Sequence, residues 1–545
     1  MKGYIEDLKR EFHGYNAQKL MKDVLAGLTV AAVALPLALA FGVSSGADAA
    51  AGMITAIVAG IVIGGLSGGS YQISGPTGAM SAILIGLSAQ YGLQGVFVAS
   101  LLSGILLILA SIFKIGKIVS FIPASVVTGF TSGIAVIIAG GQIDNFFGTV
   151  SQGSNMIEKI ASYGTLGFPI QMHTVFFGLL VIGVMIVWPK KWQSVFPSSL
   201  AAILLALLIH MCVPFEVAEV GEIPSTLFPE VRLIPTQIPW NQIRNLVFPA
   251  ISIAALGMIE SLLCGASAGK MKHEPLRADR ELLAQGIGNT ILPFFGGVPA
   301  TAAIARTSVA IKAGGQTRLV SIIHSFVLLA SMFLLGPYMS KIPMAALAGV
   351  LMMTAWRMNE WEEIKEMWQK KLKTNLIQFS VTMLATIVFD LTIAILIGLL
   401  FSCLLFIVNN ADLEISIEDI DLKRLDRELS CSHAKTKMVY LSGPMFFATQ
   451  GRVKKALMEQ VDEDVDALIF SMRAVPTIDD SGLNELKEIA QYCHQHNVYI
   501  ILCGVSRNVL KRMEQYEMLD TFDNIMWDAI KALAFLDELY RKKQK

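Results

Sequence analysis

Apolar residues dominate the chain as far as Asn410, and polar residues become frequent after it. Before Asn410, apolar stretches of roughly 15 to 25 residues recur between short polar connections, and this is the length that a helix needs to cross a bilayer. The pattern predicts about fourteen membrane-spanning segments, several of them too short to cross ~30 Å of hydrocarbon unaided. They lie approximately at residues 22–44, 49–67, 76–91, 95–113, 118–140, 173–188, 197–214, 246–268, 281–296, 299–313, 319–336, 343–356, 375–389 and 391–409.

The composition supports a membrane protein. Of the 545 residues, 54% are hydrophobic and only 16% are charged, which excludes a single soluble domain. Residues 1–21 are charged and amphipathic, and we expect them to lie on the cytoplasmic membrane surface rather than to form a cleaved signal. We therefore divide the chain into this segment, a transmembrane transport domain over residues 22–410, and a cytoplasmic linker and domain over residues 411–545. Basic and acidic residues are equal in number, 43 each, and nothing indicates a nucleic-acid partner.

Basic residues concentrate in alternate connections, which is typical of loops on the cytoplasmic side. The connection after the predicted segment 246–268, for example, carries Lys270, Lys272, Arg277 and Arg280. The opposite connections carry few, and we interpret Lys159 and Asp144 as ordinary loop charges and Asp390 as part of a tight extracellular turn. An even number of spans with both termini cytoplasmic fits this distribution, in a multi-pass protein of the inner (plasma) membrane.

Two short stretches interrupt the apolar pattern in a similar way. "ISGPTGAM" (73–80) and "GVPATAAIA" (297–305) each contain an apolar lead-in, a proline and then small residues. Proline suits the first position of a helix, so each stretch is predicted to begin a half-helix directly at Pro76 or Pro299. Two such starts, placed alike in the two halves, indicate an internal repeat. In transporters, half-helix N-termini at membrane depth receive an anion, because their free N–H groups and dipole favour negative charge. The alternative is a re-entrant turn or a kinked span that packs through small residues.

Glu260 is flanked by apolar residues about midway along its predicted segment. Because a charge inside a span is costly, such a residue is a functional candidate, and desolvation would favour its protonated form. We predict that it couples proton uptake to anion transport; the alternative is a structural carboxylate. A sodium site would need several oxygens, which Ser261 and Thr301 could supply but Cys264 could not, so proton coupling is favoured over sodium coupling.

Arg306 follows the second break and is expected in about the second turn of its half-helix. It could add positive potential to an anion cavity or pair with a carboxylate, and the sequence does not distinguish these roles. The six cysteines and eight histidines show no metal-ligand spacing, and all six thiols are predicted to be unpaired. We therefore expect no metal and no cofactor, and no residue pattern indicates an enzyme.

At this point the sequence resembles the SulP/SLC26 family of anion transporters over nearly the whole chain. The resemblance rests on "LPLALAFG" (35–42), "ISGPTGAM", "GVPATAAIARTSVAIKAGGQTRL" (297–319) and a C-terminal STAS domain. It implies fourteen segments in two inverted repeats of seven, divided into core and gate domains. It also implies elevator-like transport, usually in a homodimer, and an anion site between the third and tenth segments.

The resemblance also assigns residues. The positions that match the family's anion site are Leu37, Phe41, Thr77, Gly78, Ala79, Thr301, Ala302, Ala303 and Arg306. The resemblance implies that residues 77–79 and 301–303 offer backbone or side-chain donors, one set from each half-helix, and that Leu37 and Phe41 line the cavity. Glu260 matches the acidic position that many proton-coupled members carry. The sodium-coupled bicarbonate members have an aspartate with nearby hydroxyl groups instead, and Glu260, Cys264 and Ile304 depart from that pattern.

After residue 437, three apolar strand patterns alternate with helical patterns, which predicts an α/β sandwich. It resembles the STAS fold, and "IDDSGLNEL" (478–486) matches the loop-to-helix motif whose serine is phosphorylated in some soluble relatives. We predict that Ser481 caps this helix; a phosphate held at the same helix end is the alternative. The domain could also bind a cytoplasmic protein partner.

Together these observations predict a secondary active transporter of a small anion such as sulfate, bicarbonate or a dicarboxylate. Coupling to H+ is favoured, with sodium symport and anion exchange as alternatives. From other classes, a channel-like anion conductor and a membrane-anchored STAS sensor remain open.

Overall fold

The computed structural model describes the chain in two compact units, Met1–Leu400 and Phe401–Lys545. We call them the transmembrane unit and the C-terminal unit. The structure describes all residues except 1, 118–121, 154–155, 190, 193–195, 214, 224–225, 235, 237–242, 390, 421–434, 461–464 and 544–545. Asp390 and Cys431, predicted as part of a tight turn and as an unpaired thiol, lie outside the described residues. The boundary predicted at residue 411 directly follows helix α17 (Leu391–Asn410), whereas the division between the two units falls within this helix.

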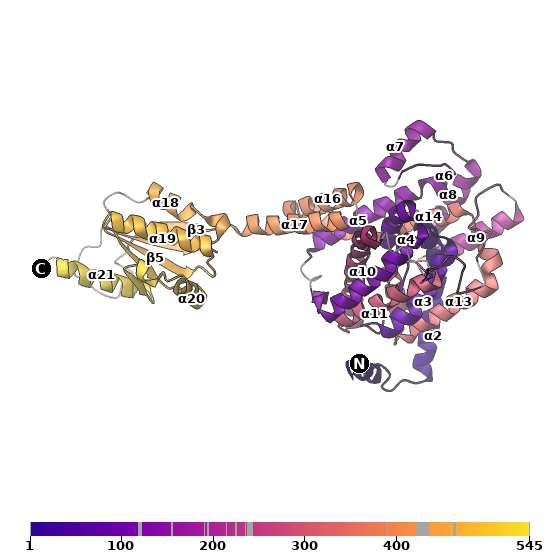
Figure 1. Cartoon of the computed structure of the whole chain (residues 1–545), viewed down its shortest axis with the longest axis horizontal. Coiled ribbons are helices and arrows are strands. Elements are labelled where there is room, and N and C mark those ends of the chain that lie inside the picture. Colours follow the sequence, from indigo (N-terminus) through magenta and orange to yellow (C-terminus); the bar gives the residue numbers. More distant parts are fainter. Residues whose placement is uncertain are drawn as a thin grey trace. The chain divides into compact units, whose positions relative to one another are not determined.

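The transmembrane unit is helical (Figure 1). Its helices are α1 (Lys2–Glu11), α2 (Ala17–Ser44), α3 (Ala49–Leu66), α4 (Gly78–Ile112), α5 (Ala124–Gly141), α6 (Ile143–Phe147), α7 (Met156–Leu166), α8 (Met172–Val187), α9 (Ser198–Cys212), α10 (Ile243–Lys272), α11 (Ala278–Ile291), α12 (Ile304–Lys312), α13 (Leu319–Met339), α14 (Met344–Met358), α15 (Trp361–Gln369), α16 (Lys373–Val388) and α17. The fourteen predicted segments correspond to α2, α3, the two parts of α4, α5, α8 to α14, α16 and α17. Helix α4 counts twice because Gly92, whose φ of 66° favours glycine, breaks it into two parts.

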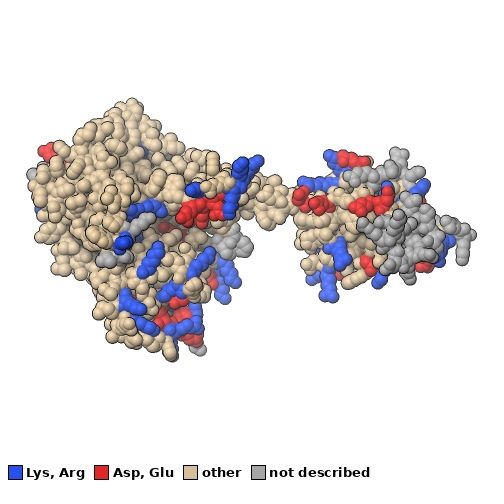
Figure 2. Space-filling model, turned by 180° about the vertical axis from the view of Figure 1, so that it is seen from behind, with Lys and Arg blue, Asp and Glu red and all other residues tan. Residues whose placement is uncertain are grey.

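Six of the described helices are long and apolar enough to cross a membrane: α2, α3, α4, the α5–α6 pair, α10 and α13. Figure 2 shows a broad area with few charged side chains on one face of this unit, and Lys, Arg, Asp and Glu side chains gathered toward one end. Many large apolar side chains on it are exposed, among them Phe176, Leu334 and Leu400. An apolar surface of this extent matches a hydrocarbon environment and supports the predicted polytopic membrane fold.

The helices of the transmembrane unit form two packed groups. In the first, α4 packs against α10 and α11, and α2 packs against α3 and α13. We call α2, α3, α4 and α10 to α13 the core bundle. In the second, α5 packs against α14 and α16, and α8 packs against α9 and α14. We call α5, α8, α9, α14 and α16 the gate bundle.

Helix α1 is fastened to the core bundle. The Tyr4 hydroxyl donates to the carbonyl of Gly65 at 2.8 Å, and the Arg280 guanidinium lies 4.2 Å from the centre of the Tyr4 ring. Asp7 pairs with both Arg277 and Arg280. In addition, Glu11 accepts hydrogen bonds from the backbone and guanidinium of Arg318. Helix α1 therefore joins the ends of three connections: that after α3, that before α11 and that before α13. In Figure 1 it lies at the opposite end of this unit from α7.

The C-terminal unit is an α/β domain, as predicted. Its sheet has the order β3-β4-β5-β6-β7, in which β3 is antiparallel to β4 and the other pairs are parallel. The strands are β3 (Glu414–Asp419), β4 (Thr436–Ser442), β5 (Ala467–Ala474), β6 (Tyr499–Cys503) and β7 (Asn524–Met526). The helices are α18 (Arg452–Gln460), α19 (Asp480–Gln495), α20 (Arg507–Gln515) and α21 (Ala529–Lys543). Separate apolar clusters hold α19 and α21 to the sheet.

The predicted cap of α19 is wrong by two positions. Asp479 is the N-cap, and its carboxylate accepts from the N–H of Gly482 at 3.0 Å. Ser481 instead lies in the first turn and is half-buried. Aspartate caps as well as serine does, so the motif alone could not decide between the two residues.

Candidate functional site

The two interrupted stretches cross each other in the core bundle. Strand β1 (Ser74–Gly75) pairs with strand β2 (Thr301–Ala302) in an antiparallel ladder, with Ser74 opposite Ala302 and Gly75 opposite Thr301. Helix α4 begins just after β1, and α12 begins just after β2. The two half-helices therefore start side by side from one short ladder, although more than 200 residues separate them along the chain.

The predicted starting positions need a correction. Helix α4 begins at Gly78, with Thr77 as its N-cap, and α12 begins at Ile304, with Ala303 as its N-cap. Neither Pro76 nor Pro299 is therefore the first helical residue. The prolines precede the helices because the residues after them are extended and, in the second stretch, belong to the ladder.

The N–H groups at the two helix starts differ in capping by a side chain and in exposure. At α4, the Thr77 hydroxyl accepts from the N–H of Met80 at 3.4 Å, and Gly78 and Ala79 occupy the first two helical positions. At α12, no side chain caps the first turn, and Ile304 and Ala305 are exposed. The first turn of a helix has N–H groups without a partner inside the helix, so both starts carry positive potential.

Ala302 and Ala303 do not supply free N–H groups, in contrast to the prediction. The N–H of Ala302 donates to the Ser261 hydroxyl at 3.2 Å, and the N–H of Ala303 donates to the carbonyl of Ile73 at 2.9 Å. Both amides are used to hold the ladder against its neighbours. The donors of this half are those of the following turn, which begins at Ile304.

Glu260 accepts hydrogen bonds from both interrupted stretches. Its Oε2 atom accepts from the Thr301 hydroxyl at 2.6 Å and from the Thr77 hydroxyl at 3.0 Å, and these two hydroxyl oxygens lie 3.0 Å apart. Thr77 and Thr301 are buried, whereas Glu260 is half-buried. One carboxyl group from α10 therefore contacts the N-cap of α4 and the strand that leads into α12.

The Arg306 side chain lies beside Gly75 and Pro76, just before the start of α4. Arg306 is in the first turn of α12 rather than the second, because this helix begins later than predicted. Its side chain is fully buried, and Nη2 donates to the carbonyl of Pro76 at 2.5 Å. Nη1 is buried beside Gly75 without a hydrogen-bond partner among the described residues. The ion pairs of the described residues do not include Arg306, so of its two possible roles the structure favours a source of positive potential.

Side chains of α2 and α5 cover the start of α4. A Cβ atom added at Gly78 would collide with the Cδ1 atom of Ile138 and lie 3.1 Å from the Phe41 ring. Phe41 and Leu37 are buried one turn apart on α2, and the carbonyl of Phe41 accepts from the Ser81 hydroxyl. Leu37 and Phe41 were predicted as lining residues. Ile138 was missed, since nothing in its apolar segment distinguishes it from its neighbours.

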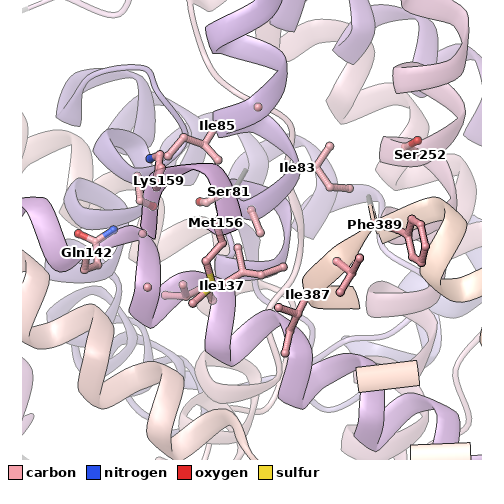
Figure 3. Close-up of a pocket in the computed structure, with 17 residues that line it drawn as sticks. Ser81, Ile83, Ile85, Ile137, Gln142, Met156, Lys159, Ser252, Ile387 and Phe389 are labelled. Carbon is pink, nitrogen blue, oxygen red and sulfur yellow. The ribbon is translucent and has the colours of Figure 1, made fainter. Parts of the chain in front are cut away.

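A cavity of about 310 Å³ has Ile138 in its lining, and Figure 3 shows residues of its wall. The core bundle contributes Ser44, Ser81 and Ser252, among others, and the gate side contributes α5, α7 and α16 with the segment after it. Lys159 of α7 lies in its wall, although the sequence analysis interpreted this residue as an ordinary loop charge. The sequence contains no sign of its position, because that depends on how α7 packs against α5.

Within the described residues, no group of three or more His, Cys, Asp and Glu side chains could hold a metal ion. The oxygens gathered at the site include the hydroxyls of Thr77, Thr301 and Ser261, the carboxyl of Glu260 and the carbonyl of Pro76. Cys264 instead donates its thiol to the Thr307 hydroxyl at 3.4 Å, deeper in the core bundle.

The whole arrangement can be compared with known proteins. The family model described as the sulfate permease family matches residues 20–385. The chain belongs to this family. A second model, that of the STAS domain, matches residues 432–532. The SulP resemblance, the polytopic helical fold and the C-terminal STAS domain are thereby confirmed, and the relatives are transporters rather than enzymes.

Two relatives align over nearly their whole length. YvdB of Bacillus subtilis, provisionally named a sulfate transporter, is 34% identical over 517 residues, which cover 91% of this chain and 93% of YvdB. The bicarbonate transporter BicA of Picosynechococcus is 29% identical over 524 residues, 91% of this chain and 90% of BicA.

Solved structures agree with the fold. The transmembrane domain of a cyanobacterial BicA has a TM-score of 0.65 at 28% identity and covers 70% of this chain and 98% of its own. Murine Slc26a9 in an inward-facing state has a TM-score of 0.84 at 17% identity, over 99% of this chain and 95% of its own. The second likeness shows the same overall fold.

Proposed function

We propose that this protein is a secondary active transporter that carries a small oxyanion together with a proton. The anion rests at the starts of α4 and α12, and Glu260 carries the proton. The observation that carries this proposal is the pair of hydrogen bonds that Glu260 accepts from Thr77, the N-cap of α4, and from Thr301, in the strand that leads into α12.

The coupling between proton and anion binding follows from the charge of the Glu260 carboxyl group. An ionised Glu260 places a negative charge beside the positive helix starts and so opposes an incoming anion. Protonation removes that charge, and the helix dipoles and Arg306 then act on the anion alone. By linkage, a proton that strengthens anion binding is itself bound more tightly when the anion is present. Sodium symport and anion exchange are the alternatives to proton coupling.

Two features support an oxyanion. Backbone N–H groups at helix starts suit oxygen acceptors, and they discriminate little between sulfate, bicarbonate and a dicarboxylate. The relatives named above are described as sulfate and bicarbonate transporters. An uptake screen of these three anions at two pH values, with and without sodium, would identify the substrate and the coupling ion.

We further propose that the core bundle moves against the gate bundle in an elevator-like manner. In the present conformation the start of α4 is covered by Phe41 and Ile138, whereas Ile304 and Ala305 at the start of α12 are exposed. The anion could pass the covered side only if the contact between α4 and α5 separates. A channel-like conductor would give flux much faster than a carrier cycle, and a STAS sensor would give none.

The setting of the protein is part of the proposal. We place it in the inner membrane, as a homodimer, with both termini cytoplasmic. The basic connections around α1 support that orientation. The C-terminal unit would bind a cytoplasmic protein, and phosphate on the half-buried Ser481 would lie at the N-terminus of α19, where a helix dipole favours it.

The test uses purified protein in proteoliposomes. Glu260→Gln keeps the size and hydrogen bonding of the side chain but cannot exchange a proton. We expect uptake driven by a pH gradient to disappear, while exchange of internal for external anion persists. Proton dependence equal to that of wild type would remove Glu260 from the mechanism.

A matched pair at Thr301 separates the hydrogen bond from packing. Thr301→Val removes the hydroxyl at nearly constant volume, whereas Thr301→Ser retains it. We expect the valine variant to shift the pH at which uptake is half-maximal, and the serine variant to stay close to wild type. Equal shifts in both would assign the effect to packing.

A further inference from the structure

Thr77, Glu260 and Thr301 are not among the residues that line the cavity in Figure 3. Ile138 belongs to both places, since it lines the cavity and also contacts Gly78 at the start of α4. Ser81, one turn further along α4, lines the same cavity. An anion inside this cavity would therefore be separated from the proposed central site by the contact between Gly78 and Ile138.

The charge of the cavity wall is one-sided. Among its described lining residues, Lys159 is the only charged side chain, and no carboxylate contributes. The remaining polar groups are the hydroxyls of Ser44, Ser81 and Ser252 and the amide of Gln142. Figure 3 shows Lys159 and Gln142 near one another, with Ile387 and Phe389 at the other end. A lone cation beside apolar walls is screened less than one in open solvent, so it attracts anions.

Helix α7 holds Lys159 in place. Met156, one turn before it, packs against Gly140 of α5. The Tyr163 hydroxyl, one turn after it, donates to Asp144 at 2.8 Å, and its ring packs edge-on against Phe168. Burial, followed by the hydrogen bond to Asp144, raises the pKa of Tyr163 to about 12. The phenol therefore keeps its proton and the anchor stays intact over the physiological range.

The acidic groups near α7 do not lie in the cavity wall. Asp144 accepts from Tyr163 and from the Ser151 hydroxyl at 2.5 Å, and neither Asp144 nor the exposed Glu158 lines the cavity. Lys159 itself has no hydrogen bond from its ammonium group to any described residue. Its charge is therefore available to a solute in the cavity, because it is not neutralised by an ion pair with a carboxylate of the described residues.

We propose that this cavity is a capture site for the transported oxyanion, with Lys159 as its binding cation, on the membrane face that carries α7. The inference rests on the proposed transport function. The anion is first held beside Lys159 and reaches the half-helix starts when the contact between Gly78 and Ile138 opens. Lys159 would then set the apparent affinity from this face, and it would not affect proton coupling at Glu260.

The experiment measures initial uptake of radiolabelled sulfate or bicarbonate into intact cells, where only the α7 face is presented to the medium. Lys159→Gln should raise KM by ~5-fold at low ionic strength, with a maximal rate within about twofold of wild type. Lys159→Glu should raise KM further, and Lys159→Arg should restore it. The differences should shrink in high salt, which a structural defect would not do.

Lys341→Gln is the matched control, since Lys341 is an exposed lysine at the far end of α13 that does not line the cavity. We expect its KM to equal that of wild type. An unchanged KM in Lys159→Glu, or an equal increase in Lys341→Gln, would overturn the capture site. A wild-type protein that takes up neither anion would instead contradict the proposed function, so the two failures are distinguishable.

Discussion

The starts of α4 and α12 share a backbone arrangement but differ in the side chains that cap, cover and charge them. Each follows one strand of the same two-residue ladder, α4 after β1 and α12 after β2. The α4 start has a threonine cap, a glycine at its first position and apolar cover from Phe41 and Ile138. The α12 start has no side-chain cap, an exposed first turn and a buried arginine. The shared ladder supplies the geometry, and residues that the two starts do not share supply the cation and the closure.

Removing the cation of the α12 start should have the largest effect. Arg306→Gln takes away the positive charge under the site and its bond to Pro76, and a hydrogen bond to a charged group contributes about 1.5–3 kcal/mol. We expect uptake to fall by roughly 10- to 100-fold, with partial recovery in Arg306→Lys. Arg318→Gln, which breaks the contact of α1 instead, is the control. It should lower the melting temperature without raising KM. Normal affinity in Arg306→Gln would show that the two starts need no cation.

A larger side chain at the first residue of α4 should reduce uptake, because Phe41 and Ile138 already cover this helix start. A side chain in Gly78→Val would collide with Ile138 and Phe41, and overpacking of this kind costs about 1–3 kcal/mol. Uptake should fall by about 10-fold, and Ile138→Ala in the same chain should restore part of it. At the α12 start, Ile304→Ala should leave uptake within about twofold of wild type, because that side chain is already exposed. Equal losses at the two starts would contradict the difference between them.

Removing the cap of the α4 start should reduce stability moderately. Thr77→Val loses the bond to the N–H of Met80 and one of the two donors to Glu260. Loss of an N-cap costs about 1 kcal/mol, and we expect a drop in melting temperature of about 1–2 °C. Ala303→Ser, which offers a cap where α12 has none, should leave the melting temperature the same or raise it slightly. A larger loss in Ala303→Ser than in Thr77→Val would reverse the proposed asymmetry.

Changing a second carboxyl–threonine contact, away from the half-helix starts, should have the smallest effect on stability and none on uptake. Between α14 and α15, Glu360 accepts from the Thr128 hydroxyl at 2.6 Å, as does Glu363 at 2.9 Å. Burial, and then repulsion from Glu363, raises the pKa of Glu360. A carboxyl group whose pKa is raised in the folded state stabilises the fold in acid, and this contribution is lost as pH rises through the folded pKa.

Glu360→Gln should therefore weaken the fall in melting temperature between mildly acidic and neutral pH, by about 1 °C. It should leave pH-driven uptake unchanged, in contrast to Glu260→Gln. Loss of proton coupling in Glu360→Gln would show that the coupling group is not confined to the two starts.

The sequence was sufficient to predict the fold class, the number of segments and a helix start at each interrupted stretch, because apolar length and paired prolines are local signals. It did not predict the ladder between Ser74 and Ala302, since pairing over such a separation leaves no local pattern. For that reason both helix starts were placed too early, and the N–H groups of Ala302 and Ala303 were assigned to the anion. Glu260 stood out as a lone charge in an apolar segment. Lys159 did not, because a lysine in a connection looks alike whether it faces solvent or a cavity.

In the proposed mechanism, one site binds the anion and the proton together. It is tested most directly by adding anion to the purified protein in weak buffer and measuring proton uptake with a pH indicator. For wild type we predict uptake of about one proton per bound anion near the pH of half-maximal transport, and none for Glu260→Gln at an anion concentration that still saturates it. Anion binding by wild type without proton uptake, or equal proton uptake by both proteins, would contradict the account.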